Sequence, residues 1–237
     1  MSIISHNLQA VLECIADAAH AVSRAPHEVR LLAVSKSFGP QAVLEAAHAG
    51  QTAFGENYLQ EALDKMAAVR AAQSTRPNGM LEWHFIGPIQ SNKTRLIAEH
   101  FDWVHTVERE KIAQRLSEQR PAHLPPLNVC LQINISGESS KSGAAPEDAA
   151  TLARAVADMP RLKLRGLMAI PEPADTFDLQ RAPLRRLRQL SEHLNAQGFG
   201  LDTLSMGMSA DMRAAIAEGA TIVRVGTAIF GPRNYAK

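Results

Sequence analysis

A single lysine, Lys36, closes a run of apolar residues and is the strongest candidate in the sequence for covalent chemistry. The run Leu31–Val34 is entirely apolar, with an arginine before it and a Gly-Pro pair soon after Lys36. Such a run is typical of a short strand buried on both faces of a parallel sheet. A buried ammonium loses its proton more easily, and an unprotonated lysine can form a Schiff base with a carbonyl group. The alternative is a lysine whose ammonium simply reaches solvent at the strand end.

Two further groups suit the binding of a phosphate. Ser209 precedes a predicted helix over 210–218 and is placed to cap it, so that its hydroxyl and the next backbone N–H groups would face an anion. Gly226 and Thr227 follow a predicted strand, where glycine permits close backbone approach and threonine adds a hydroxyl donor. Read one at a time, Ser209 can be a plain helix cap and Thr227 an ordinary loop residue.

Arg224 interrupts the apolar strand Ile-Val-Arg-Val, in which it shares one side with Ile222 and Gly226. Arginine stays charged, so in the interior of a protein its N–H groups need acceptors. Three interpretations remain open. Arg224 pairs with a carboxylate inside the fold, points outward between helices, or donates to an acceptor atom of a ring-shaped cofactor.

Eight predicted strands position these residues, and a helix-length segment separates each strand from the next. Strict alternation of strands and helices predicts a parallel sheet with the helices outside. Eight units in this length favour a closed (β/α)8 barrel of the TIM type over an open doubly wound sheet. The predicted strands are 31–36, 52–55, 83–87, 103–107, 127–135, 164–170, 201–206 and 221–226. The predicted helices between and after them are 40–49, 56–72, 91–100, 108–119, 146–158, 177–197 and 210–218.

An extra amphipathic helix over 5–24, with Ser5 as its expected N-cap, precedes the first strand. No linker or repeat divides the chain, so we expect one domain over residues 1–237. In a barrel of this type the active face lies at the carboxyl ends of the strands, and phosphate commonly binds after the seventh and eighth. Lys36, Ser209 and Gly226-Thr227 all fall on that face.

Composition excludes several classes of function. The 237 residues carry 25 Lys and Arg against 24 Asp and Glu, a net charge of +1, so no strong field attracts nucleic acid or an anionic membrane. The two cysteines form no CxxC pattern, which argues against a disulfide scaffold or zinc cluster and indicates a reducing cytoplasm. The sequence has no signal-peptide pattern and no run near the ~20 apolar residues of a membrane span.

Several long motifs, in order along nearly the whole chain, resemble one family. The chain is similar to the YggS/PROSC-like pyridoxal phosphate homeostasis proteins, single barrels that are similar to the N-terminal domain of fold-type III alanine racemases. The motifs that carry this resemblance are LLAVSK (31–36), FGENYLQE (54–61), WHFIGPIQSNK (83–93), INISGESSKSG (133–143), GLMAIP (166–171), LSMGMSADMRAAI (204–216) and VRVGTAIFGPR (223–233).

The resemblance implies a pyridoxal 5′-phosphate (PLP) site. By this resemblance Lys36 would hold PLP as an internal aldimine, and Arg224 would face the pyridine nitrogen. Ser209, Gly226 and Thr227 would hold the phosphate. The ring's pocket would be lined by Asn57, with Met206 and His84 as further pocket residues. For His84, which lies in an apolar strand, a hydrogen-bonded core histidine is an equal alternative.

One segment departs from the family's pattern. The family often has a second lysine two positions after the Schiff-base lysine, whereas Phe38 stands there in this chain. Any role for a lysine at that position is therefore in doubt. Lys141, in the loop after the fifth predicted strand, is another candidate for transient PLP capture, although a solvated loop lysine is the stronger interpretation.

The residues favour a carrier over an enzyme. A permanent cation at the pyridine nitrogen disfavours its protonation, which makes the ring a poorer electron sink. The tyrosines, Tyr58 and Tyr235, are not evident substitutes for the second base that racemases take from another domain. We therefore expect a monomer without catalytic residues that buffers PLP or delivers it to PLP-dependent apo-enzymes. The alternatives are an amino-acid racemase or related PLP enzyme, a class I aldolase-like barrel using Lys36 without PLP, and a scaffold for protein partners.

Overall fold

The computed structural model describes residues 2–73, 81–137 and 142–232, and these form a closed barrel of eight parallel strands. Each strand pairs with the strands before and after it in the sequence, and β1 pairs with β8 to close the ring. The predicted (β/α)8 barrel is therefore confirmed. The strands are β1 (Arg30–Val34), β2 (Ala53–Glu56), β3 (Glu82–Phe85), β4 (Trp103–Val107), β5 (Leu127–Gln132), β6 (Leu162–Met168), β7 (Thr203–Ser205) and β8 (Ile222–Val225).

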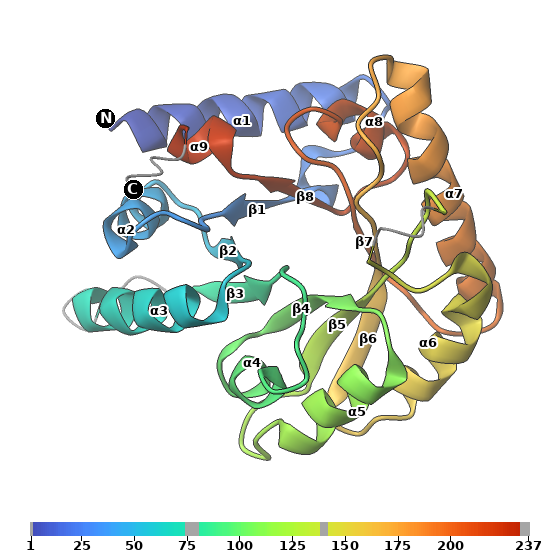
Figure 1. Ribbon diagram of the computed structural model, residues 1–237. Coiled ribbons are helices and arrows are strands. Elements are labelled where there is room, and N and C mark those ends of the chain that lie inside the picture. Colours follow the sequence, from blue (N-terminus) through green and yellow to red (C-terminus); the bar gives the residue numbers. More distant parts are fainter. Residues whose placement is uncertain (1, 74–80, 138–141, 233–237) are drawn as a thin grey trace.

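Helices surround the strands on the outside of the barrel (Figure 1). Short 3-10 turns at 26–28 and 146–148 precede β1 and α6. The helices are α1 (Ile3–His20), α2 (Pro40–His48), α3 (Leu59–Gln73), α4 (Thr94–His100), α5 (Glu110–Gln119), α6 (Ala149–Ala157), α7 (Phe177–Ala196), α8 (Met212–Ala217) and α9 (Thr227–Phe230).

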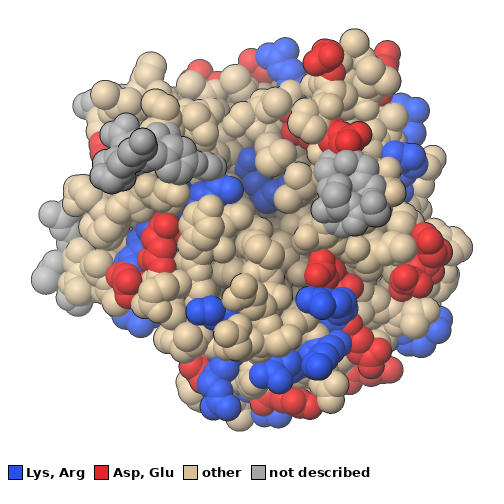
Figure 2. Space-filling view, in the orientation of Figure 1, with Lys and Arg blue, Asp and Glu red and all other residues tan. Residues whose placement is uncertain are grey.

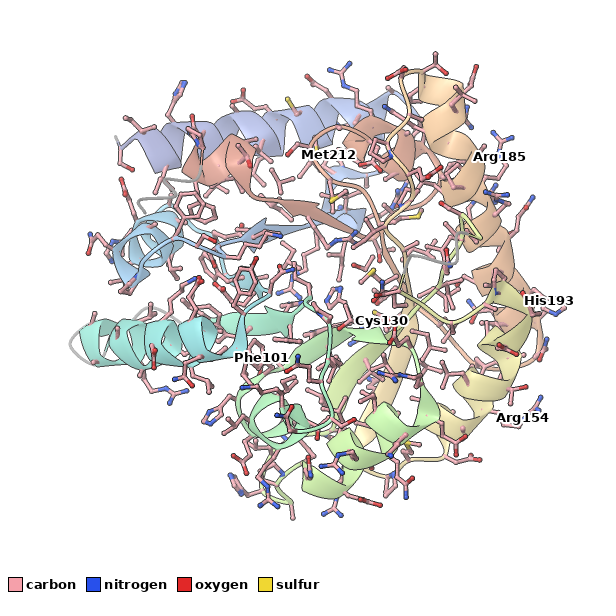
Figure 3. All side chains as sticks on the ribbon, viewed as in Figure 1. Phe101, Cys130, Arg154, Arg185, His193 and Met212 are labelled. Carbon is pink, nitrogen blue, oxygen red and sulfur yellow. The ribbon has the colours of Figure 1, made fainter. Side chains whose placement is uncertain are left out.

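Side chains on each strand alternate between two buried layers, because successive residues of a strand point to opposite faces. Val223 and Val225 of β8 belong to the large apolar layer between the strands and the helices. Ile222, two positions before Arg224, belongs instead to a small cluster inside the barrel, with Leu32 and Cys130. Figure 3 shows Cys130 on β5 near the middle of the barrel. Arg224 shares its side of the strand with Ile222, as the alternation predicted, and therefore points into the interior, which the sequence had left open.

The helix α1 lies along the outside of the barrel next to α8 and α9 (Figure 1), so that it covers the seam between the first and last strands. Its buried face consists of Leu8, Val11, Ile15, Ala18 and Ala19. At the same seam the Asn7 side-chain amide donates to the carbonyl of Ile229 at 3.0 Å. The predicted extra helix is thus present, but it begins earlier than expected, and Ser2 rather than Ser5 is its cap: the Ser2 hydroxyl accepts from the N–H of Ser5.

Other boundaries also differ from the prediction. The first strand ends at Val34 and not at Lys36, because the chain turns sharply at Ser37, whose φ is +66°. The fifth strand ends at Gln132, and beyond it Ile133 forms only an isolated bridge with Ala144. The third helix begins at Leu59 rather than at residue 56, because Glu56 still belongs to β2. In the described part of the chain, no helix has both the length and the apolar character needed to cross a membrane.

Candidate functional site

The strand register brings the ends of β1, β2 and β8 together at one mouth of the barrel. Val34 is paired with Gly55, so Lys36 and Asn57 each lie two residues beyond that pair. Ala33 is paired with Val225, and a Cβ built on Gly226 would lie 3.0 Å from the carbonyl oxygen of Val34. Lys36, Asn57 and Gly226 therefore follow neighbouring strand ends, with Thr227 next to Gly226.

The turn that carries Lys36 is held by backbone and side-chain bonds. The N–H of Ser35 donates to Gly55 at 3.0 Å, and the N–H of Phe38 returns to the Ser35 carbonyl at 3.1 Å. Between them Ser37 adopts a left-handed conformation, which non-glycine residues rarely take. Its N–H donates to the carboxylate of Glu61 on α3 at 2.6 Å. The Lys36 side chain, at the edge of this turn, is half-buried.

A second lysine, Lys65 on α3, lies buried beneath this turn. Its ammonium donates to the Ser35 carbonyl at 2.7 Å, to Glu56 at 2.6 Å and to Glu61 at 3.0 Å. The Ser35 hydroxyl also donates to the same Glu56 oxygen at 2.6 Å. Burial raises the pKa of Glu56, whereas the charge and hydrogen bond of Lys65 oppose that rise. The other oxygen of Glu56 has no partner within the described residues.

Arg224 lies deeper in the barrel than Lys36, opposite Leu32 of β1. Its guanidinium donates to the carbonyl of Ser205 at 2.6 Å, to the Ser205 hydroxyl at 2.9 Å and to the carbonyl of Ala169 at 3.0 Å. Burial lowers the pKa of Arg224 to about 10, so it remains a cation at neutral pH. Of the three interpretations, an outward position is wrong, and the contacts to strand-end oxygens hold the cation inside the barrel.

The loop between β7 and α8 carries Ser209 beside β8. Gly207 has φ +95°, and a Cβ there would meet the side chain of Ala215 at 2.5 Å, so this turn requires glycine. The Gly207 carbonyl accepts the N–H of Arg224 at 2.9 Å, which joins the loop to β8. Ser209 is exposed, and Met206 is fully buried. The start of this loop is therefore bonded to β8, the strand that Gly226 and Thr227 follow.

The expected capping role of Ser209 is wrong. The helix α8 begins at Met212, and its N-cap residue is Asp211. The carboxylate of Asp211 accepts the N–H of Met208 at 2.7 Å and so closes the turn in which Ser209 lies. The hydroxyl of Ser209 is not committed to the helix by this arrangement, because the shorter helix starts three residues later.

Asn57 and Gly87 come into close contact at the ends of β2 and β3. A Cβ on Gly87 would lie 2.2 Å from the Asn57 carbonyl oxygen, so a side chain cannot be placed there without moving Asn57. The side-chain oxygen of Asn57 is buried and has no hydrogen-bond partner within the described residues. An unpartnered buried acceptor is costly, so a ligand that supplies a donor is favoured at this position.

His84 is a fully buried core histidine inside the barrel. One ring nitrogen lies 2.6 Å from Glu82, and the other lies 2.8 Å from a ring nitrogen of His105. Its ring is stacked on Trp103, with the two planes 7° apart. Both ring nitrogens of His84 therefore have partners within the protein. This arrangement corresponds to the hydrogen-bonded core histidine that the sequence left as an alternative.

Sequence reasoning missed Lys65, Glu56 and the pair His105 and Ser205. The signal for Glu56 and His105 was available, since both are titratable residues within otherwise apolar strands. Lys65 gave no signal, because a lysine on a surface helix usually faces solvent. Lys141 and Tyr235 lie outside the described residues. Among the residues described, no group of three or more His, Cys, Asp or Glu side chains is arranged to hold a metal ion.

The site thus combines an amine, a buried cation and a set of hydroxyl and backbone donors at one barrel mouth. Figure 2 shows Lys or Arg atoms in a hollow near the centre of the face it presents. An aldehyde could react with the amine of Lys36, and an acceptor atom could face Arg224. An anionic group would suit the loop after β7 and the first turn of α9, because the first N–H groups of a helix have no acceptor within it.

Comparisons with known proteins show which family the chain is similar to. The family model described as the alanine racemase N-terminal domain matches residues 7–234. The pyridoxal phosphate homeostasis protein of Pseudomonas aeruginosa is 61% identical over 235 residues, covering 99% of this chain and 98% of that protein. The protein of the same description from Escherichia coli is 54% identical over 237 residues and covers all of both chains.

Several solved structures are similar to this chain in fold. PipY of Synechococcus elongatus with PLP bound is 37% identical, with a TM-score of 0.76, over 92% of this chain and 100% of that one. An unknown protein from Bifidobacterium adolescentis is 33% identical with a TM-score of 0.90, over 96% of this chain and 94% of that one. Alanine racemase of Corynebacterium glutamicum, at 19% identity and a TM-score of 0.68, shares the fold; this chain covers 62% of it.

Proposed function

Because the chain belongs to the pyridoxal phosphate homeostasis protein family, we propose that Lys36 holds PLP covalently at the mouth described above. The protein binds PLP and acts in PLP homeostasis, as a relative that is 61% identical over its full length and the PLP-bound structure of PipY indicate. The observation that carries the assignment to Lys36 is its position at the end of β1, between the strands that present Asn57 and Gly226.

The residues at the mouth fit PLP in their chemistry. The buried oxygen of Asn57 lacks a donor within the described residues and would line the ring's pocket. The cationic guanidinium of Arg224 suits an unprotonated pyridine nitrogen, which accepts a hydrogen bond. Ser209 and Thr227 are both exposed, and their hydroxyls, with the backbone of Gly226, would hold the phosphate. Met206 lies buried behind this loop.

PLP supplies an aldehyde that condenses with a lysine amine. Lys36 in its unprotonated form would add to the aldehyde carbon, form a C=N bond and release one water. Arg224 would keep the pyridine nitrogen unprotonated, since two positive charges repel each other. Release would follow when the amine of another protein replaces the nitrogen of Lys36, so no oxidant or further co-reactant is needed.

Three features support a carrier over an enzyme with robust turnover. Arg224 remains a cation and weakens the ring as an electron sink. Tyr58, the one tyrosine within the described residues, is 55% exposed and directly precedes α3. Burial raises the pKa of the Cys130 thiol to about 12, so the only interior thiol in the described chain stays protonated and unreactive.

The acceptors we propose are PLP-dependent apo-enzymes, because delivery to them would use the same exchange of amines. A monomer would suffice, since Lys36, Asn57 and Arg224 come from one chain. We place this action in the cytoplasm, whose reducing conditions suit the free thiols of Cys14 and Cys130.

The decisive experiment is the visible absorbance of the purified protein before and after borohydride reduction, followed by peptide mapping of the modified lysine. We expect a chromophore that borohydride removes, with the reduced adduct on Lys36. Lys36→Ala should lose it, whereas Lys111→Ala, an exposed lysine on α5, should keep it. A colourless wild-type protein, even after incubation with PLP, or an adduct on another lysine would refute the assignment. Exchange of an amino acid's Cα proton with deuterated water would instead favour the racemase alternative.

A further inference from the structure

A continuous chain of hydrogen bonds runs through the barrel interior from its amino-end mouth to Arg224. We call it the interior chain. His105 is its central member: one ring nitrogen lies 2.8 Å from His84, and the other lies 2.7 Å from the Ser205 hydroxyl. The members, in order, are Arg30, Glu82, His84, His105, Ser205 and Arg224.

Donor chemistry allows the bonds between the two histidines and Ser205 to run in either of two directions, and the carboxylate of Glu82 decides between them. Arg224 can only donate, so the Ser205 oxygen accepts from it and the single hydroxyl hydrogen of Ser205 is available for Nδ1 of His105. In the direction in which this hydrogen goes to Nδ1 of His105, that nitrogen is an acceptor, and the hydrogen of the ring lies on Nε2, which donates to Nδ1 of His84.

The same logic continues to the other end. His84 accepts at Nδ1 and therefore carries its hydrogen on Nε2, which donates to the Glu82 carboxylate at 2.6 Å. Arg30 donates to the same oxygen at 2.7 Å. Both imidazoles are thus neutral and carry hydrogen on Nε2, and every donor from Arg224 to His84 points towards Glu82. The reverse direction would leave an unprotonated nitrogen facing a carboxylate, unless the chain gained a proton.

Electrostatics agree with this assignment. Burial lowers the pKa of His84 and lowers that of His105 well below the ordinary value, so both rings are neutral at neutral pH. Burial alone would raise the pKa of Glu82, but the hydrogen bond from His84 and the charge of Arg30 outweigh it and bring the pKa to about 2. The chain therefore has a carboxylate at one end, a cation at the other and two neutral rings between them.

The middle of the interior chain is buried, whereas its end at Arg30 and Glu82 is accessible to solvent. His84, His105 and Ser205 are each fully buried. The side chains of Arg30 and Glu82 are 40% and 31% exposed. A group at the cofactor mouth is thus connected, through side chains alone, to an ion pair that solvent reaches at the opposite mouth.

We propose that His84 and His105 are positioning residues that act through Ser205 to hold the Arg224 guanidinium against the pyridine nitrogen of bound PLP. This inference rests on the proposed function, since it assigns how that site keeps the ring nitrogen unprotonated. Ser205 offers its oxygen to Arg224 because its hydrogen is drawn to His105. Without His105 the hydroxyl can rotate, and the guanidinium loses one of its fixed acceptors.

The first test needs no PLP. Nitrogen-15 NMR of the unloaded protein reports which ring nitrogen of each histidine carries the hydrogen. We expect His84 and His105 to be neutral with hydrogen on Nε2 at neutral pH. Hydrogen on Nδ1 of either ring, or a protonated ring, would overturn the direction of the chain and with it the proposal.

The second test measures the pyridine nitrogen of bound, nitrogen-15-labelled PLP as a function of pH. In His105→Leu and in Ser205→Ala we expect the pKa of that nitrogen to rise by about one unit, because the opposing cation is no longer held against it. His105→Asn, whose amide can take the place of Nδ1, should stay closer to wild type. Met168→Leu, a substitution inside the barrel but outside the interior chain, should not change it.

Ser205→Ala and His105→Asn keep the test decisive if His105→Leu fails to fold. Ser205→Ala removes only a hydroxyl group. A ring pKa equal to wild type in Ser205→Ala and in every folded His105 variant would overturn the proposal and leave the proposed function intact. A shift as large in Met168→Leu would overturn it too, by assigning the effect to barrel packing. A wild-type protein that carries no PLP on Lys36 would refute the proposed function and, with it, the positioning role. In that case the NMR of the unloaded protein would still report the direction of the hydrogen bonds in the interior chain.

Discussion

The ammonium of Lys65 lies 2.6 Å from the carboxylate of Glu56, and the side chains of both residues are almost completely buried. This pair lies directly beneath the turn of Lys36, because Lys65 also donates to the carbonyl of Ser35. A charge pair removed from water is sensitive to the loss of either member, since the remaining charge has no partner. Here that sensitivity extends to the residue proposed to hold PLP.

Lys65→Met should lower the free energy of unfolding by about 3–5 kcal/mol, the usual cost of leaving one charge of a buried pair alone. Chemical denaturation measures it. The double variant Lys65→Met with Glu56→Gln should recover much of the loss, because no fully buried charge is then left unpaired; Glu61, which also loses Lys65, is 34% exposed. Lys111→Met, which changes an exposed lysine of α5, should have little effect. A single variant as stable as wild type would contradict the structural role of the pair.

Ser37→Val should destabilise the protein by roughly 1–2 kcal/mol, because a β-branched residue is strained at φ +66°. It should also weaken retention of PLP during dialysis, since the turn of Lys36 would shift. Ser23→Val is the matched control, because Ser23 has φ +57° on the exposed chain after α1. It should cost similar stability and leave retention unchanged. Equal loss of PLP in both variants would indicate a global effect rather than a local one.

Gly87→Ala should reduce both stability and PLP binding. The added methyl group would lie 2.2 Å from the backbone oxygen of Asn57, so the strand end that carries Asn57 must move. Gly39→Ala serves as the control, because nothing lies within 4 Å of a Cβ at that position and its φ is −74°. Absorbance titration with PLP and thermal unfolding check the two effects. Unchanged PLP affinity in Gly87→Ala would argue against Asn57 as a pocket residue.

Stability should fall as the pH drops below about 6.5, the ordinary pKa of histidine. The pKa values of His84 and His105 are lower in the folded protein, so the unfolded chain binds protons first and folding becomes less favourable as the pH falls. The groups that face these rings are Glu82, Arg30, Trp103, Ser205 and Arg224. Glu82, with a pKa lowered to about 2, adds a further loss as the pH falls below its ordinary value of 4.5 towards 2.

Urea denaturation at several pH values measures this dependence. Each proton that the unfolded chain binds in excess changes the slope by about 1.4 kcal/mol per pH unit. His105→Asn should flatten the dependence between pH 6.5 and 5, because one titrating group is removed. His193→Asn, at the end of α7 on the surface, should not. An unchanged slope in His105→Asn would show that His105 takes up its proton equally in the folded and unfolded states, against the lowered pKa.

The fold could be predicted largely because its pattern is local. Apolar runs such as Leu31–Val34 and their separation by helix-length segments determine eight β/α units. The ends of elements were less predictable, because they depend on tertiary bonds. Glu56 remained in β2 because it is buried and pairs with Phe85 in the register, whereas its charge suggested the start of a helix.

The site was predictable where residues lie at strand ends. Lys36, Asn57 and Gly226 met at one mouth because parallel strands deliver their carboxyl ends together. The groups beneath them were not predictable, since Lys65 comes from a helix whose sequence gives no sign of which lysine turns inward. The pairing of His84 with His105 depends on the stagger of β3 against β4, which the sequence pattern does not contain.

The seam covered by α1 also constrains the order in which the chain can assemble. Asn7 of α1 bonds to Ile229, 222 residues later, and β1 needs β8 as a neighbour. During synthesis α1 and β1 leave the ribosome well before α9 and β8, their partners at this seam. Until then β1 has an unpaired edge and α1 an uncovered apolar face, which are the features that promote aggregation and chaperone binding. Such long-range closure is also slow, so we expect the pairing of β1 with β8 to be a late event in folding.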